Sequence, residues 1–256
     1  MRVRGWRSIW LVAALAAAAG CNAVLGPSKP DANWHIVDTA RFSLHVRPYS
    51  FAEQHASAIG AILEDQYDAT LAALDVRYSA RITAVLYESA RDGNLPSDHS
   101  GTAFPSTNAF EASCAPPYDA NLASLLSHEA NHVIIQNTLG TPGTYMLSEG
   151  LASAVLSEHT YTQGRRFYYA WARYHRSELP PISRLADDAE WNKVPDDVAY
   201  STAASFLAYL LETAGPARLK QIYLARSSEF ERRFDEIYGR PLSAVEQDWL
   251  AFCDRQ

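Results

Sequence analysis

The spacing of apolar residues divides the chain into a short mixed part and a longer helical part. Apolar and polar residues alternate over Phe42–Val46, and Ile82–Tyr87 is an almost continuous apolar run, so both stretches predict strands. Between them, residues 51–74 place apolar side chains three and four positions apart, which predicts a helix. Residues 109–115 fit either a short strand or an ordinary loop. We therefore expect a small α/β portion in the N-terminal half.

Helical spacing dominates the rest of the chain. It covers residues 119–139, 145–159, 165–177 and 198–213, and helical segments continue to the C-terminus. In the first of these stretches, Asp119 or Asn121 can cap the start, and Gly140 ends the pattern. The whole pattern predicts an α+β protein, with a small N-terminal α/β portion that holds a short sheet, followed by a mainly helical portion.

The helix predicted over residues 119–139 carries a polar group on an otherwise apolar element. His128 and His132 stand at positions i and i+4, one turn apart, so both imidazoles can reach one ion. Glu129 completes the H-E-x-x-H pattern that binds zinc on one helical face. Buried polar side chains must be hydrogen-bonded, paired or metal-bound, because leaving them unsatisfied costs several kcal/mol. The alternative is that neighbouring groups satisfy the histidines and no metal is bound.

A third metal ligand must come from outside this helix, because a catalytic zinc site uses three protein ligands and leaves a fourth position open. Glu149 is the best candidate, since it follows His132 across a glycine- and proline-containing turn at residues 140–143. Gly150 has no Cβ and would let the helix that carries Glu149 approach the first helix closely. Glu129 is then free to act as a general base.

Two motifs, H-E-A-N-H at residues 128–132 and L-S-E-G-L-A at residues 147–152, together resemble those of the gluzincin metallopeptidases. The similarity is to the small bacterial peptidase MA-like domains, and it covers about residues 34–249. The resemblance implies an active site between the α/β and the helical portions. It also implies three zinc ligands and one catalytic base, which are His128, His132, Glu149 and Glu129.

The resemblance adds two further expectations. A sheet-edge strand ahead of the metal helix would lie along the cleft and pair with an extended peptide; the alternative is an ordinary loop. Tyr200 would donate a hydrogen bond to the oxyanion of the tetrahedral intermediate; the alternative is a plain core residue. Met146 departs from the family, which often has Trp three residues before the glutamate, and this difference concerns packing more than chemistry.

The first 20 residues have the features of an export signal, so we do not expect them to belong to the folded domain. Three arginines precede an apolar run over residues 9–19, and the A-A-G-C sequence that ends at Cys21 resembles a bacterial lipobox. We therefore expect a lipoprotein signal peptide at 1–20, a tether at 21–33 and the metallopeptidase domain at 34–256. The lipid on Cys21 would anchor the protein on the periplasmic side, with the outer membrane favoured by Asn22. The alternative is an ordinary signal peptide and an incidental Cys21.

Charge and cysteine content narrow the range of partners. The formal net charge is −7 and becomes −10 once the three arginines of the first 20 residues are removed. No basic run occurs, so nucleic acid is not an expected partner. Besides Cys21 the chain has Cys114 and Cys253, which form a disulfide or remain two separate thiols.

The sequence as a whole predicts a Zn²⁺-dependent metallopeptidase of the bacterial cell envelope that hydrolyses a peptide or protein substrate. Two other interpretations stay open. One is a non-catalytic, zinc-stabilised lipoprotein that binds a peptide or envelope partner, against which Glu129 weighs, because a pure binder needs no base. The other is a structural envelope lipoprotein without a metal.

Overall fold

The structure, a computed structural model, describes residues 27, 33–93, 95, 100–157 and 164–256. The expected signal peptide, Cys21 and almost all of the tether lie outside these residues. The helix predicted over 145–159 ends earlier, at Ala154, and residues 155–157 are not helical. Among the described helices, none is both long and apolar enough to cross a bilayer.

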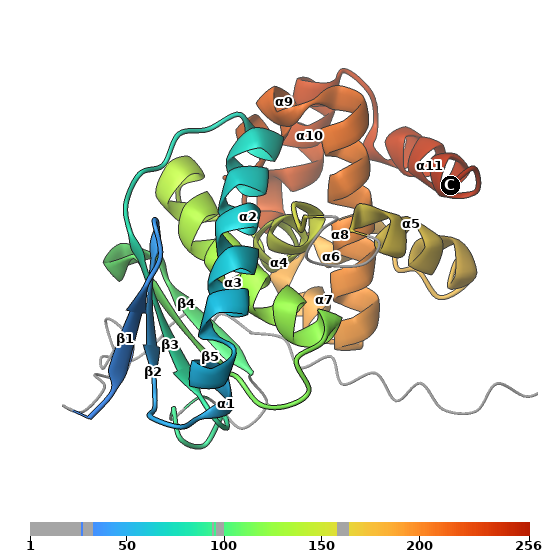
Figure 1. The fold of residues 1–256 in the computed structure, drawn as a ribbon. Helices are drawn as coiled ribbons and strands as arrows, with labels where there is room; N and C mark the ends of the chain where they lie inside the picture. The colour runs from blue at the N-terminus through green and yellow to red at the C-terminus, as the bar shows by residue number, and fades with distance from the viewer. Residues whose placement is uncertain (1–26, 28–32, 94, 96–99, 158–163) are drawn as a thin grey trace, which may run out of the picture.

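A five-stranded mixed sheet forms the N-terminal part of the fold (Figure 1). In chain order its strands are β1 His35–Asp38, β2 Phe42–Val46, β3 Ile82–Tyr87, β4 Gly101–Phe104 and β5 Ala109–Ser113. They lie in the order β1-β2-β3-β5-β4, with the three inner strands parallel and the two edge strands antiparallel to their neighbours. The predicted strands β2 and β3 are confirmed. Residues 109–113 form the strand β5, but the expectation that this strand lies at the edge of the sheet is wrong, because β4 pairs with its outer side. The edge strands β1 and β4 were not predicted, because four residues carry too little alternation.

Two long helices cover one face of this sheet. The helical elements of this part are α1 Phe51–Gln54, α2 Ala56–Leu74, the 3-10 turn η1 Pro105–Thr107 and α3 Ala120–Leu139. The single helix predicted over residues 51–74 is broken at His55, whose ψ of 7° departs from helical values. Ser50 caps the separate first turn by accepting a hydrogen bond from the main-chain N–H of Glu53.

The C-terminal part consists of helices, which Figure 1 shows on the other side of α2 and α3 from the sheet. They are α4 Tyr145–Ala154, α5 Arg165–Tyr174, α6 Ile182–Leu185, α7 Asp188–Trp191, α8 Asp196–Ala214, α9 Pro216–Ile222, the 3-10 turn η2 Ser227–Glu229, α10 Phe230–Tyr238 and α11 Leu242–Cys253. The central helix α8 packs against α4, α5 and α9. The predicted α+β class, with a small sheet-containing portion before a mainly helical one, is confirmed.

Two large apolar cores hold these parts, beside a small cluster of Leu156, Tyr168 and Ala204, and α3 contributes to both large cores. Its side chains Leu126, Val133 and Ile134 pack with the sheet and α2, whereas Ile135 belongs to the core of the C-terminal helices. Cys114 lies in the first core and Cys253 in the second, and both are free thiols. The two cysteines are therefore separate, and they form no disulfide with each other.

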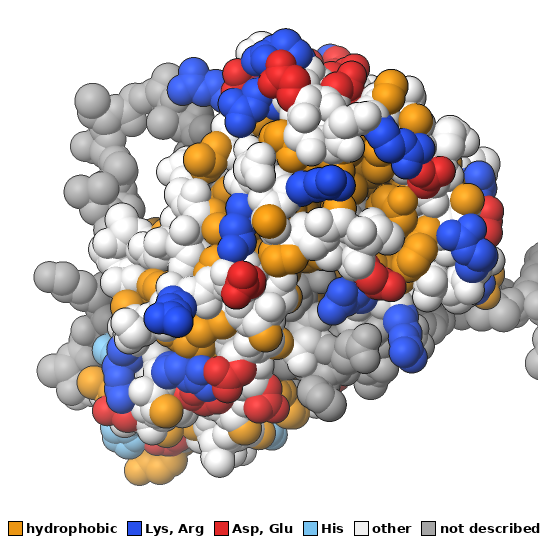
Figure 2. All heavy atoms as spheres, turned by 90° about the horizontal axis from the view of Figure 1, so that it is seen from above, with side chains coloured by type: hydrophobic (Ala, Val, Ile, Leu, Met, Phe, Trp, Pro, Cys, Tyr) orange, Lys and Arg blue, Asp and Glu red, His pale blue; other side chains and the backbone are white. Residues whose placement is uncertain are grey.

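The surface carries mixed charge. On the face that Figure 2 shows, basic and acidic side chains are interspersed and do not gather into a patch of one sign. Many of these charges form exposed ion pairs, such as Arg232 with Glu236 and Arg240 with Asp248. Pairs of this kind contribute little to stability, so the stability of the fold depends on its two cores.

Gly150 packs against α8. The prediction that it would face α3, the helix that carries the histidines, is wrong. A Cβ at this position would lie 2.8 Å from the Cβ of Ala203 and 3.0 Å from a methyl group of Leu207. Both distances are shorter than van der Waals contact. Helices α4 and α8 therefore approach as closely as they do because residue 150 has no side chain.

Replacing Gly150 with valine should destabilise the protein, because the added atoms overpack the contact between α4 and α8. Overpacking costs about 1–3 kcal/mol, which for a domain of this size lowers the Tm by roughly 2–4 °C per kcal/mol. Thermal unfolding followed by circular dichroism measures the change. Ala217→Val enlarges an exposed position of α9 and should leave the Tm almost unchanged. Equal Tm values for the two variants would contradict the close packing.

Candidate metal centre

Two histidines and a glutamate from consecutive helices converge on one point. The Nε2 atoms of His128 and His132 lie 2.9 Å apart, and Oε2 of Glu149 lies 3.1 Å from the first and 3.2 Å from the second. All three side chains are buried. The structure therefore brings together the three residues predicted as ligands, in a group that could hold a metal ion.

The separation of these donor atoms fits a metal ion better than it fits hydrogen bonds alone. Metal–ligand distances of about 2.0–2.2 Å in a tetrahedral arrangement separate the ligand atoms by roughly 3.3 Å. If both imidazoles instead donate Nε2–H groups to Glu149, two hydrogens meet across the 2.9 Å between the nitrogens, and neither Nε2 can accept a hydrogen bond from the other. A cation would replace both hydrogens. Two imidazoles and a carboxylate suit zinc, although other first-row metals take the same donors.

Helix caps and one serine fix the positions of the ligands. Asp119 caps α3 by accepting hydrogen bonds from main-chain N–H groups of its first turn, and Thr144 does the same for α4. At the other end of α4, Oγ of Ser153 lies 3.2 Å from Nδ1 of His128. This contact orients the imidazole so that its Nε2 faces Glu149.

Electrostatics keep Glu149 ionised. Burial works against its charge, but electrostatic interactions with the imidazoles of His132 and His128, together with hydrogen bonds from their rings, outweigh burial and lower its pKa to about 2. The carboxylate is therefore negative throughout the physiological pH range. A buried negative charge between two imidazoles is the electrostatic environment that a cation requires.

Glu129 stands beside this group with both carboxylate oxygens buried and without a hydrogen-bond partner among the described residues. Burial raises its pKa to about 8, while the charge of His128 lowers it and that of Glu149 raises it. The carboxylate lies against the first residue of β4. A Cβ on Gly101 would be 2.7 Å from Cγ and Oε1 of Glu129, so any larger residue at position 101 would displace the acid.

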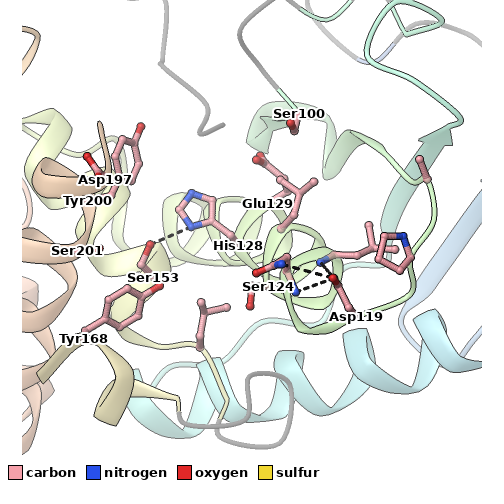
Figure 3. Close-up of a pocket in the computed structure, with 16 residues that line it drawn as sticks. Ser100, Asp119, Ser124, His128, Glu129, Ser153, Tyr168, Asp197, Tyr200 and Ser201 are labelled. Carbon is pink, nitrogen blue, oxygen red and sulfur yellow. Dashed lines mark hydrogen bonds between the residues drawn. The ribbon is translucent and has the colours of Figure 1, made fainter. Parts of the chain in front are cut away.

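A cavity of about 310 Å³ opens beside His128 and Glu129 (Figure 3). Its walls come from several elements and include His128, Glu129, Ser153, Tyr168 and Tyr200. Its size falls at the lower end of the range of small-molecule sites, about 300–1,000 Å³. The candidate metal ligand His128 and the unpartnered acid Glu129 thus face the same space, where part of a ligand can bind.

Tyr200 lies in the wall of this cavity, near the start of α8. Its ring centroid is 6.5 Å from that of His128, and its ring packs edge-on against Trp191 at 5.3 Å. Burial, and then the negative charge of Glu149, raise the pKa of the Tyr200 hydroxyl well above its ordinary value. The hydroxyl is therefore protonated at physiological pH. The structure brings Tyr200 to the site, and its role as an oxyanion donor stays a prediction.

Ser153 and Gly101 are site residues that the sequence analysis did not identify. Ser153 follows Glu149 by one helical turn, so its spacing in the sequence could have placed it on the same face of α4 as the ligand. Nothing in the sequence indicates the role of Gly101, because its closeness to Glu129 depends on the position of β4 at the edge of the sheet.

The fold and the site define an α+β protein with a buried His-His-Glu group between its two cores. No family model matches the chain, and no curated protein matches it significantly. The resemblance to the gluzincin peptidases therefore remains a prediction that rests on the two motifs.

Replacing Ser153 with alanine should weaken metal binding about 10- to 100-fold, the usual effect of removing a group that orients a metal-ligating histidine. The dissociation constant for zinc, measured by competition with a chelator, reports the change. Ser124→Ala is a matched control, because Ser124 also lines the cavity but bonds to the main-chain oxygen of Ala120. Equal loss of affinity in both variants would show that the contact between Ser153 and His128 has no specific role.

Proposed function

We propose that the protein is a zinc-dependent peptidase. The observation that carries this proposal is Glu129, a buried carboxylate with no described partner that faces the same cavity as His128. An unpartnered buried acid is costly for a protein that only binds a metal or a peptide, because leaving such a group unsatisfied opposes folding. A general base, in contrast, must keep its lone pairs free for the reacting proton. Burial favours the neutral form of Glu129, and the charge of a cation held beside it would favour the ionised form that a base requires.

The proposed roles follow from the positions of the side chains. His128, His132 and Glu149 would hold the metal ion, which when bound lowers the pKa of water and polarises a carbonyl group. Glu129 would accept a proton from the attacking water and later deliver it to the leaving amine. Tyr200 would donate a hydrogen bond to the oxygen that becomes negative in the transition state.

The sheet edge supports a peptide as the substrate. Strand β4 pairs with β5 on one side, and no described strand pairs with its other edge. Its first residue, Gly101, contacts Glu129. An extended peptide added to this edge would pass the base, and main-chain hydrogen bonds would bind it without regard to its side chains. We also propose that a lipid on Cys21 attaches the protein to a membrane of the bacterial cell envelope.

The variant Glu129→Gln tests the proposal. It keeps the size of the side chain but removes the base, so turnover of a mixed peptide library, followed by mass spectrometry, should fall by at least about 100-fold. Metal content should be unchanged, because Glu129 is not among the converging donor atoms. The same exchange at Glu236, an exposed residue of α10, is the control and should leave turnover intact.

Two outcomes would contradict the proposal. Glu129→Gln with wild-type turnover would exclude Glu129 as the base. A metal-loaded wild-type protein that binds peptides but cleaves none would favour the alternative, a non-catalytic zinc-stabilised binding protein.

A further inference from the structure

We infer that Gln66 and Asn131 are positioning residues that hold the two ligand-bearing helices in register, and so set the geometry of the metal centre. The inference rests on the metal centre of the proposed function but not on the peptidase reaction. It starts from a set of buried side chains, Gln66, Thr70 and Asn131, which we call the amide bridge. All three are fully buried, at 0% exposure.

Asn131 joins α3 to α4. It lies between the two histidine ligands on α3, and its Nδ2 donates a 2.7 Å hydrogen bond to the main-chain oxygen of Ala152. Ala152 belongs to α4, less than one turn beyond Glu149. The bond therefore connects the two ligand-bearing helices at the level of the ligands themselves.

Gln66 joins this pair to α2. Its Nε2 lies 3.0 Å from Oδ1 of Asn131 and 3.0 Å from the main-chain oxygen of Val155, where α4 ends. Its Oε1 accepts a 2.9 Å hydrogen bond from the main-chain N–H of Ser157. One side chain of α2 thus satisfies main-chain groups just past α4 that no helical bond can satisfy.

Thr70 completes the bridge. Its hydroxyl lies 2.6 Å from Oδ1 of Asn131 and 2.9 Å from the main-chain oxygen of Gln66. Asn131 therefore receives support from two successive turns of α2. Such a network is satisfied only when its donors and acceptors face one another at hydrogen-bonding distance, so it fixes orientation more strictly than apolar packing does.

Apolar packing alone does not align the ligands, because the two helices bury most of their apolar side chains in different cores. Leu126 and Val133 of α3 pack with the sheet, whereas Leu147 and Leu151 of α4 pack with the C-terminal helices. A small shift between the cores would separate Glu149 from the histidines. The amide bridge spans this boundary and opposes that shift.

The test compares Gln66→Met with Tyr67→Phe in the full chain. Gln66→Met keeps the length of the side chain but removes its hydrogen bonds to α3 and to the end of α4. Tyr67→Phe is the matched control, because it removes a hydrogen bond from the next residue of α2 to the main-chain oxygen of Tyr78. Each variant is measured for its zinc dissociation constant, for the visible spectrum of bound Co²⁺ and for its Tm in the metal-free state.

We expect both variants to lower the metal-free Tm, but only Gln66→Met to weaken zinc binding at least 10-fold and to change the Co²⁺ spectrum, which reports ligand geometry. A zinc affinity within twofold of wild type and an unchanged spectrum would overturn the inference. If Gln66→Met does not fold, the zinc dissociation constant and the Co²⁺ spectrum of Thr70→Val test the inference instead. This nearly isosteric variant removes one hydrogen bond to Asn131 and should weaken zinc binding severalfold.

The same experiment separates this inference from the proposed function. A wild-type protein that binds zinc, with Gln66→Met unaffected, overturns only the positioning role. A wild-type protein that binds neither zinc nor Co²⁺ overturns the metal centre, and with it both proposals.

Discussion

Three polar side chains meet at a buried point between two apolar cores, and the need to satisfy them explains much of the surrounding structure. The two imidazoles and the carboxylate of Glu149 are buried and lie within about hydrogen-bonding distance of one another. Burying a charge without compensation costs several kcal/mol. A cation compensates all three groups at once. The short connection from α3 to α4, the cap on each helix and the serine behind His128 then serve to keep the three atoms together.

The boundary between the cores is a suitable place for such a site. In the middle of a core the polar group would be sealed, and on the open surface its ligands would be free to move. At the boundary, α3 buries most of its length, yet His128 and Glu129 still line a cavity. The helices on either side of the boundary are held by apolar packing to different neighbours, so polar contacts such as the amide bridge must align them.

Local spacing made one part of the site predictable. His128, Glu129 and His132 stand on one helix, where position in the sequence fixes position in space. Glu149 could be inferred because a short turn returns the chain. The contact of Gly101 with Glu129 and the link from Gln66 to Asn131 could not, since both depend on how α2 and the sheet pack on α3. The short strands β1 and β4 were missed for a different reason, because four residues carry too little alternation, and the apolar spacing continues through His55 without a sign of the break between α1 and α2.

The metal content of the full chain tests the central claim, that His128, His132 and Glu149 form a metal site. The protein would be reconstituted with zinc, freed of unbound metal and analysed for its elements beside Glu149→Ala, with His45→Ala as a control that removes a histidine of β2. We expect about one zinc ion per chain in the parent and in the control, and a clear loss in Glu149→Ala. A parent that holds no metal, or a Glu149→Ala protein that holds as much as the parent, would contradict the three-ligand site.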